Sequence, residues 1–110
     1  ITQQMRLKTL SPKEYAAHQS KAYKWGKDQQ ACLRALWGKE SAWNYQAKSP
    51  TKDYGIPQRH MSHNTQMEIQ DFLRHPHIQI DWGLGYIKSR YGSPCAAWKF
   101  RLFHALAQNC

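Results

Sequence analysis

The sequence predicts one mainly helical domain, with about five helices and a long loop after the second helix. Apolar side chains recur at helical spacing along most of the chain. The exception is residues 44–63, which are rich in Ser, Pro, Gly, Asn and Lys. A chain of 110 residues can bury one modest core. We therefore expect a single domain over residues 1–110, in which residues 1–10 form an arm.

The first helix is expected to begin at Ser11 and to end at Gly26. Pro12 suits the first helical position, and Glu14, three residues after Ser11, completes a capping box. Gly26 favours termination because glycine readily adopts the left-handed conformation found at helix ends.

The second helix carries the most informative residue of the chain, Glu40. We expect Asp28 to cap this helix. Cys32, Leu36 and Glu40 are four residues apart, so the acid falls on the apolar stripe. A buried carboxyl is costly unless it is paired or neutral, and desolvation raises a carboxyl pKa toward the range that a general acid needs. Glu40 is therefore the candidate catalytic acid.

The loop over residues 44–63 contains a turn, Tyr54-Gly55-Ile56-Pro57-Gln58, which follows the acid closely in the sequence. A long stretch without regular structure is usually functional in a compact domain, and this one has room for a small hairpin. An acid followed by a polar and aromatic turn indicates a site that cleaves carbohydrate.

Two helices are predicted directly after the loop. The first begins at Asn64 or Thr65 and is broken at His75-Pro76, and the next runs from about Pro76 to Arg90. The second of these helices has two apolar stripes, which predicts burial on most sides. One stripe holds Ile78, Trp82, Gly85 and Tyr86, and the other holds Ile80, Leu84, Ile87 and Tyr91.

The last helix is expected to begin at Ser93-Pro94, which provides a cap and a proline at the first helical position. Trp98, Leu102 and Leu106 are four apart and are predicted to point inward.

The chain is strongly basic, with 16 Lys and Arg against 7 Asp and Glu and a net charge of +9. Such an excess favours an anionic polymer as partner, which nucleic acid, cell wall and lipid all are. The basic residues are scattered, and neither a helix-turn-helix spacing nor an aromatic RNA platform accompanies them. We therefore expect no nucleic acid as partner. No apolar run reaches the roughly 20 residues of a membrane span.

No metal and no cofactor are expected. The cysteines lack the Cys-x-x-Cys spacing, and the six histidines lack a matching cysteine or carboxylate cluster. Three cysteines allow one disulfide and one remaining thiol, for which Cys110 at the end of the sequence is the candidate.

Two motifs in order make the chain resemble a known family. Glu40-Ser41-Ala42-Trp43-Asn44 and Tyr54-Gly55-Ile56-Pro57-Gln58 are similar to the Glu-Ser and Gly-x-x-Gln signature of soluble lytic transglycosylases in the lysozyme-like superfamily. Residues 79–87 and 90–98 are similar to a branch found in secreted bacterial proteins and phage tail proteins. The resemblance covers about residues 25–98 and implies an α+β lysozyme-like variant of the mainly helical fold.

The resemblance implies roles for individual residues. Glu40 would be the single acid/base that breaks the β-1,4 bond between N-acetylmuramic acid and N-acetylglucosamine in peptidoglycan, leaving a 1,6-anhydro sugar. Tyr86 and Trp98 would lie beside the glycan, with core packing as an even alternative. The other substrate-binding residues implied are Ser49, Tyr54, Gly55, Ile56 and Gln58.

The same branch often has cysteines at the positions of Cys32 and Cys95, which implies a disulfide. A disulfide suits an oxidising, extracytoplasmic site of action, whether secreted, periplasmic or on a virion, and a domain of a larger phage or secreted protein. The alternative is that both cysteines are small buried residues in a reducing compartment.

Two alternatives to the transglycosylase remain open. A hydrolytic lysozyme would use Glu40 with a held water or with a second carboxylate about 5 to 9.5 Å away, for which Asp53 is the candidate. A non-catalytic wall-binding module would keep Glu40 only as a structural residue. The chain departs from the family at Trp98-Lys99-Phe100-Arg101, where relatives commonly have Tyr-Asn-x-Gly. The segment from Phe100 onward is therefore expected to be a separate elaboration.

Overall fold

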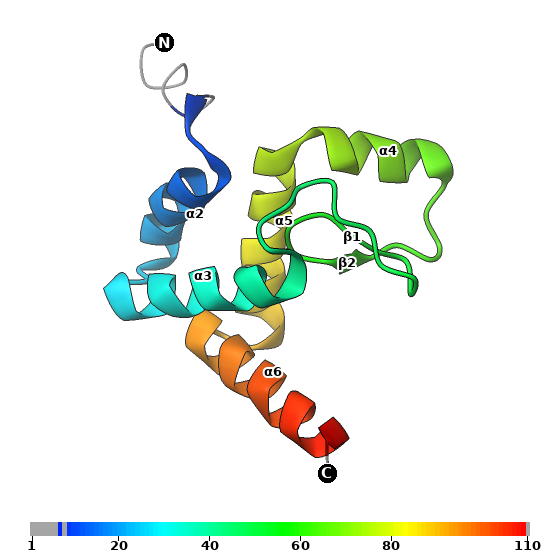
Figure 1. Ribbon diagram of the computed structural model, residues 1–110. Coiled ribbons are helices and arrows are strands. Elements are labelled where there is room, and N and C mark those ends of the chain that lie inside the picture. Colours follow the sequence, from blue (N-terminus) through cyan, green and yellow to red (C-terminus); the bar gives the residue numbers. More distant parts are fainter. Residues whose placement is uncertain (1–6, 8, 110) are drawn as a thin grey trace.

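The computed structural model describes the backbone of residue 7 and residues 9–109, and side chains as far as residue 104. Helices dominate this part of the chain, and α5 lies among α2, α4 and α6 (Figure 1). The elements are α2 (Pro12–Ser20), the 3-10 turn η1 (Lys21–Tyr23), α3 (Lys27–Ser41), β1 (Asp53–Tyr54), β2 (Arg59–His60), α4 (Gln66–Arg74), α5 (Pro76–Arg90) and α6 (Pro94–Asn109). The mainly helical prediction, with five helices and a small hairpin, is confirmed.

The first predicted helix is confirmed at its start and wrong at its end. The Ser11 side chain accepts from the Glu14 amide, and the Glu14 carboxylate accepts from the Ser11 amide, as the capping box predicts. Helix α2 stops at Ser20, and η1 follows it. Lys24 then turns the chain in the left-handed conformation with φ of 61°, so the helix ends before the glycine at 26 is reached.

The predicted cap of α3 is also wrong. Gly26, in extended conformation, is the N-cap, and Asp28 lies in the first helical turn. An acid there faces the free amides of the helix N-terminus, which is favourable without a side-chain cap. Ala42 ends α3 in the left-handed conformation with φ of 53°.

The long loop contains the predicted hairpin. Strands β1 and β2 are antiparallel, with Asp53 opposite His60 and Tyr54 opposite Arg59. An additional bridge pairs Lys48 with Tyr54, so the hairpin is attached to the part of the loop that follows α3.

Helices α4 and α5 begin as predicted, but α5 is less buried than its two apolar stripes suggest. Thr65 caps α4 with a capping box completed by Glu68. On α5, Ile78 is 53% exposed and Tyr86 is 46% exposed. A single face of α5 is buried, and it comprises Gln79, Ile80, Gly83, Leu84 and Ile87. On the other stripe, Trp82 and Tyr86 line a hollow, and Trp82 also packs against Phe72 of α4.

Helix α6 is joined to α3 by a disulfide between Cys32 and Cys95, as the resemblance implied. Ser93 caps the helix through a hydrogen bond from the amide of residue 96. The predicted inward stripe is wrong at Leu102, which is 42% exposed. The side chain of Leu106 lies outside the described residues.

The core consists of two clusters. The larger joins α2, α3, α5 and α6 around Trp37, Leu33 and Ile80, and the smaller joins α4 to the loop around Phe72 and Met61. None of the helices in the part of the chain that the structure describes is long and apolar enough to cross a membrane. Most of the predicted arm over residues 1–10, together with Cys110, lies outside the described residues.

Candidate active site

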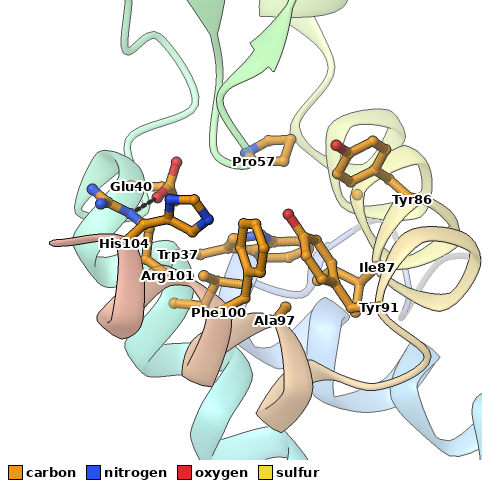
Figure 2. Close-up of a pocket in the computed structure, with 12 residues that line it drawn as sticks. Trp37, Glu40, Pro57, Tyr86, Ile87, Tyr91, Ala97, Phe100, Arg101 and His104 are labelled. Carbon is orange, nitrogen blue, oxygen red and sulfur yellow. Dashed lines mark hydrogen bonds and ion pairs between the residues drawn. The ribbon is translucent and has the colours of Figure 1, made fainter. Parts of the chain in front are cut away.

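Glu40 lies in the last turn of α3, on the wall of a cavity of about 150 Å³. Its side chain is 24% exposed, so the carboxyl can reach a ligand while most of it is shielded. The cavity is bounded by α3, α5, α6 and the turn that contains Pro57 (Figure 2). Its apolar lining is Leu36, Trp37, Pro57, Gly83, Tyr86, Ile87, Tyr91, Ala97 and Phe100, and its polar lining is Glu40, Arg101 and His104.

Ser41, the residue after the acid, fixes the turn opposite. Its hydroxyl donates to the carbonyl of Ile56 at 2.7 Å and to the carbonyl of Trp37 at 3.3 Å. One hydroxyl thus connects the end of α3 to the turn, which brings Pro57 to the cavity that contains Glu40. This contact gives a physical reason for the Glu-Ser pair.

Gln79 holds the same turn from the other side. Its side-chain oxygen accepts from the Ile56 amide at 2.8 Å, and its side-chain nitrogen donates to the carbonyls of Tyr45 and Phe72, each at 2.9 Å. Gln79 is fully buried, so these hydrogen bonds form in a low-dielectric interior where an unpaired amide would be costly. Gln79 was not predicted, because it lies on neither of the two apolar stripes expected on this helix.

Gly55 is required where the turn passes Gln79. Its φ is +78°, and a Cβ built on it would lie 2.6 Å from the Gln79 side-chain oxygen. The glycine therefore allows both the left-handed backbone and the close approach of the amide.

We expect Gly55→Ala to lower the free energy of unfolding by about 2 to 5 kcal/mol, measured by urea denaturation. Left-handed alanine costs about 1 to 2 kcal/mol and overpacking costs a further 1 to 3 kcal/mol. Gly92→Ala is the matched control, because Gly92 has φ of +90° but nothing within 4 Å of a built Cβ. Equal losses in both variants would contradict the role of the Gln79 contact.

A second hollow of about 320 Å³ adjoins the cavity, and the two share Pro57 and Tyr86. Trp82 and Tyr86 stack with their ring centroids 5.1 Å apart, and the guanidinium of Arg59 lies 4.9 Å from the Trp82 ring. Together the two hollows extend from Glu40 across Tyr86 to the hairpin. The second hollow is lined by Asp53, Pro57, Gln58, Arg59, His60, Trp82 and Tyr86.

Asp53 lies in this second hollow, and its carboxylate is held by neighbouring side chains. It accepts from the hydroxyls of Ser49 and Thr51 and contacts the His60 ring at 3.0 Å. Burial acts to raise the pKa of Asp53, but the hydrogen bonds from Thr51, His60 and Ser49, with the charge of His60, outweigh burial and lower the pKa. Asp53 is therefore ionised at neutral pH.

The structure brings some predicted site residues together and places others elsewhere. Tyr86 lines both hollows, and Gln58 lines the second, where its side chain donates to the carbonyl of Gly55 at 3.0 Å. The other predicted residues line neither hollow. Ser49 donates a hydrogen bond to Asp53, and Gly55 and Ile56 are buried. Tyr54 packs on the smaller core cluster, and Trp98 packs on the larger one.

Helix α6 contributes residues that the sequence analysis missed. Phe100, Arg101 and His104 line the cavity, so the segment after Phe100 is part of the site, and its description as a separate elaboration was wrong. Together with Ala97 these residues form a stripe with spacings of three, one and three. The sequence contains this stripe at helical spacing, but the apolar stripe through Leu102 was predicted to point inward. Burial raises the pKa of the hydroxyl of Tyr91, another residue that lines the cavity.

Among the described residues, no group of three or more His, Cys, Asp or Glu side chains is placed to hold a metal ion.

A helical fold with an acid at a helix end and a Gly-x-x-Gln turn facing it defines a lysozyme-like protein. The transglycosylase SLT domain family has a sequence model that matches residues 16–106, and the chain belongs to this family of peptidoglycan lytic transglycosylases. Both hollows and the disulfide lie within the matched range. No curated protein and no solved structure matches the chain.

Proposed function

We propose that this protein cleaves the β-1,4 bond between N-acetylmuramic acid and N-acetylglucosamine in peptidoglycan and leaves a 1,6-anhydro-muramyl end. Glu40 is proposed as the single acid and base. The observation that carries the proposal is that Glu40 is the one carboxylate among the described residues that line the cavity.

One carboxyl suffices for this reaction because the substrate supplies the nucleophile. Glu40 first donates a proton to the glycosidic oxygen, and the bond to the departing sugar breaks. The Glu40 carboxylate then takes the proton from the C6 hydroxyl of the muramyl sugar. The C6 oxygen bonds to C1, the 1,6-anhydro ring closes, and no water is consumed.

The lining of the cavity suits this chemistry. Trp37, Ile87 and Phe100 form apolar walls next to Glu40, and such walls exclude water that would compete with the C6 hydroxyl. Tyr86 and Trp82 present stacked rings along the adjoining hollow. Flat rings of this kind pack against the apolar faces of sugars. Gln58 would add amide hydrogen bonds to the same strand.

The partner implied is the peptidoglycan strand, and the proposed site of action is extracytoplasmic. The disulfide between Cys32 and Cys95 fits an oxidising environment. The net charge of +9 would favour retention on an anionic wall. We propose that the domain serves within a larger phage or secreted protein.

A hydrolytic lysozyme is the second candidate, because Asp53 lines the hollow next to the Glu40 cavity and is ionised. Against it, the Asp53 carboxylate is already engaged by Ser49, Thr51 and His60. A general base for water needs a free lone pair, and a carboxylate with about four acceptor sites has little capacity left here.

The proposal is tested by mass spectrometry of the muropeptides that the native chain and Asp53→Asn release from purified peptidoglycan. We expect anhydro-muramyl ends from both proteins, at rates within about threefold of each other, because the carboxylate that reacts is Glu40. Reducing ends from the native chain, lost in Asp53→Asn, would replace the transglycosylase with a hydrolase. Binding without any release would leave a wall-binding module.

A further inference from the structure

The carboxylate proposed as catalytic is engaged by a cation from another helix. Arg101 Nε on α6 lies 2.5 Å from Glu40 Oε1, and the two side chains are 39% and 24% exposed respectively. Figure 2 shows the pair at the edge of the cavity, with His104 beside it. The disulfide between Cys32 and Cys95 joins the start of α6, the helix that carries Arg101, to α3.

This pairing differs from the arrangement that catalysis requires. In the ion pair Glu40 accepts a hydrogen bond, whereas a general acid must donate one to the glycosidic oxygen. A guanidinium has five donors and no acceptor, so Arg101 has no means of receiving a proton from Glu40. The hydrogen bond from Arg101 occupies Oε1, so proton donation from that oxygen requires the guanidinium to leave it.

Arg101 is 39% exposed, so water can hydrate a displaced guanidinium, but another anion would bind it more strongly. No other carboxylate lines the cavity among the described residues. Asp53 lines the adjoining hollow and is already bonded by Ser49 and His60. A replacement anion for Arg101 would therefore come from the bound ligand.

We infer that Arg101 is a specificity-determining residue, whose guanidinium exchanges Glu40 for a carboxylate on the C3 substituent of the bound muramyl sugar. The inference rests on the proposed function. That carboxylate is either the lactyl group of a bare strand or an acidic group of the stem peptide. In both cases, the bound carboxylate replaces Glu40 as the partner of Arg101, so Glu40 Oε1 is released. A planar guanidinium fork suits a carboxylate well. A strand without any carboxylate leaves the ion pair in place.

The test compares three strands with the same β-1,4 N-acetylated backbone. They are peptide-bearing glycan, amidase-stripped glycan that keeps its lactyl carboxylates, and a neutral chitooligosaccharide. For the native chain we expect kcat/KM on the carboxylate strands to exceed that on the neutral strand by about 10- to 100-fold, as one charge-assisted hydrogen bond allows. Preference for stripped glycan over chitooligosaccharide identifies the lactyl group as partner, and preference only for peptide-bearing glycan identifies the stem peptide.

Arg101→Ala is expected to reduce this ratio to below about threefold, because the charged hydrogen bond that produced it is gone. KM should rise on carboxylate strands, and kcat should rise on the neutral strand because Glu40 is no longer engaged. Arg101→Gln, which keeps a long polar side chain, should behave alike and provides a second variant if alanine lowers the Tm. Lys99→Ala removes the same charge from an exposed position of the same helix and should keep the native ratio.

Three outcomes would overturn the inference while leaving the proposed function intact. They are equal cleavage of all strands by the native chain, an unchanged ratio in both Arg101 variants, and a parallel loss on every strand. Absence of cleavage by the native chain on all three strands would instead overturn the proposed function, and the inference with it.

Discussion

Replacing Glu40 with Gln is expected to lower kcat for release of muropeptides by about 100- to 10,000-fold, the range that general acid–base catalysis contributes. Glutamine keeps the shape of the side chain but has no proton to give and takes none from the C6 hydroxyl. The measurement is the initial rate of release from purified peptidoglycan, followed by chromatography. Strand binding should persist, because the aromatic rings and Gln58 are untouched.

A loss of activity caused by unfolding must be distinguished from a loss caused by removal of the acid. The ion pair with Arg101 is partly exposed, and such pairs contribute about 0 to 1 kcal/mol, so Glu40→Gln should unfold close to the native chain. Asp71→Asn removes a carboxylate whose side chain is 68% exposed and lines neither hollow, and it should keep full activity. Retention of a tenth or more of the native rate by Glu40→Gln would rule out Glu40 as the acid.

The second large effect is expected when the disulfide is removed. Changing Cys32 and Cys95 together to Ser should lower the free energy of unfolding by about 4 kcal/mol, the loop-closure value for a bridge of this span. The separation is 63 residues. The corresponding fall in Tm is roughly 15 °C or more. Thermal unfolding followed by circular dichroism provides the measurement.

Reducing agent gives the matched comparison. Dithiothreitol should destabilise the native chain toward the double variant and should leave the double variant unchanged. Activity should fall with stability, because α6 carries Phe100, Arg101 and His104 into the cavity and the bridge fixes the start of that helix. A native chain that melts at the same temperature with and without reductant would contradict this account.

The parts that sequence could predict depend on local signals. The capping residues Ser11 and Thr65 stand next to the helices they start, and each completes its box three residues later. The position of Glu40 followed from helical spacing on α3. The turn Tyr54-Gly55-Ile56-Pro57-Gln58 was identified by its composition and by its resemblance to a known motif.

The rest depends on contacts between residues far apart in sequence. Arg101 meets Glu40 across 61 residues, and Gln79 reaches Ile56 across 23 residues. Neither contact has a local pattern. The rotation of α6 that directs Arg101 inward and Leu102 outward is fixed where Cys95 joins α3. Hydrophobic spacing favoured the stripe through Leu102, because Arg101 and His104 make the cavity-lining stripe less apolar.

The buried amide of Gln79 has a mechanical consequence for the two hollows. It joins the turn at Ile56, the loop at Tyr45 and the end of α4 at Phe72, so we expect these three segments to move together. The side of the two hollows that the turn forms is therefore expected to stay fixed. The outer part of α6 projects away from the remaining helices (Figure 1). We expect the outer part of α6, beyond the start that the disulfide holds, to be the part that moves, so that a glycan strand is admitted by its displacement and not by opening of the hairpin.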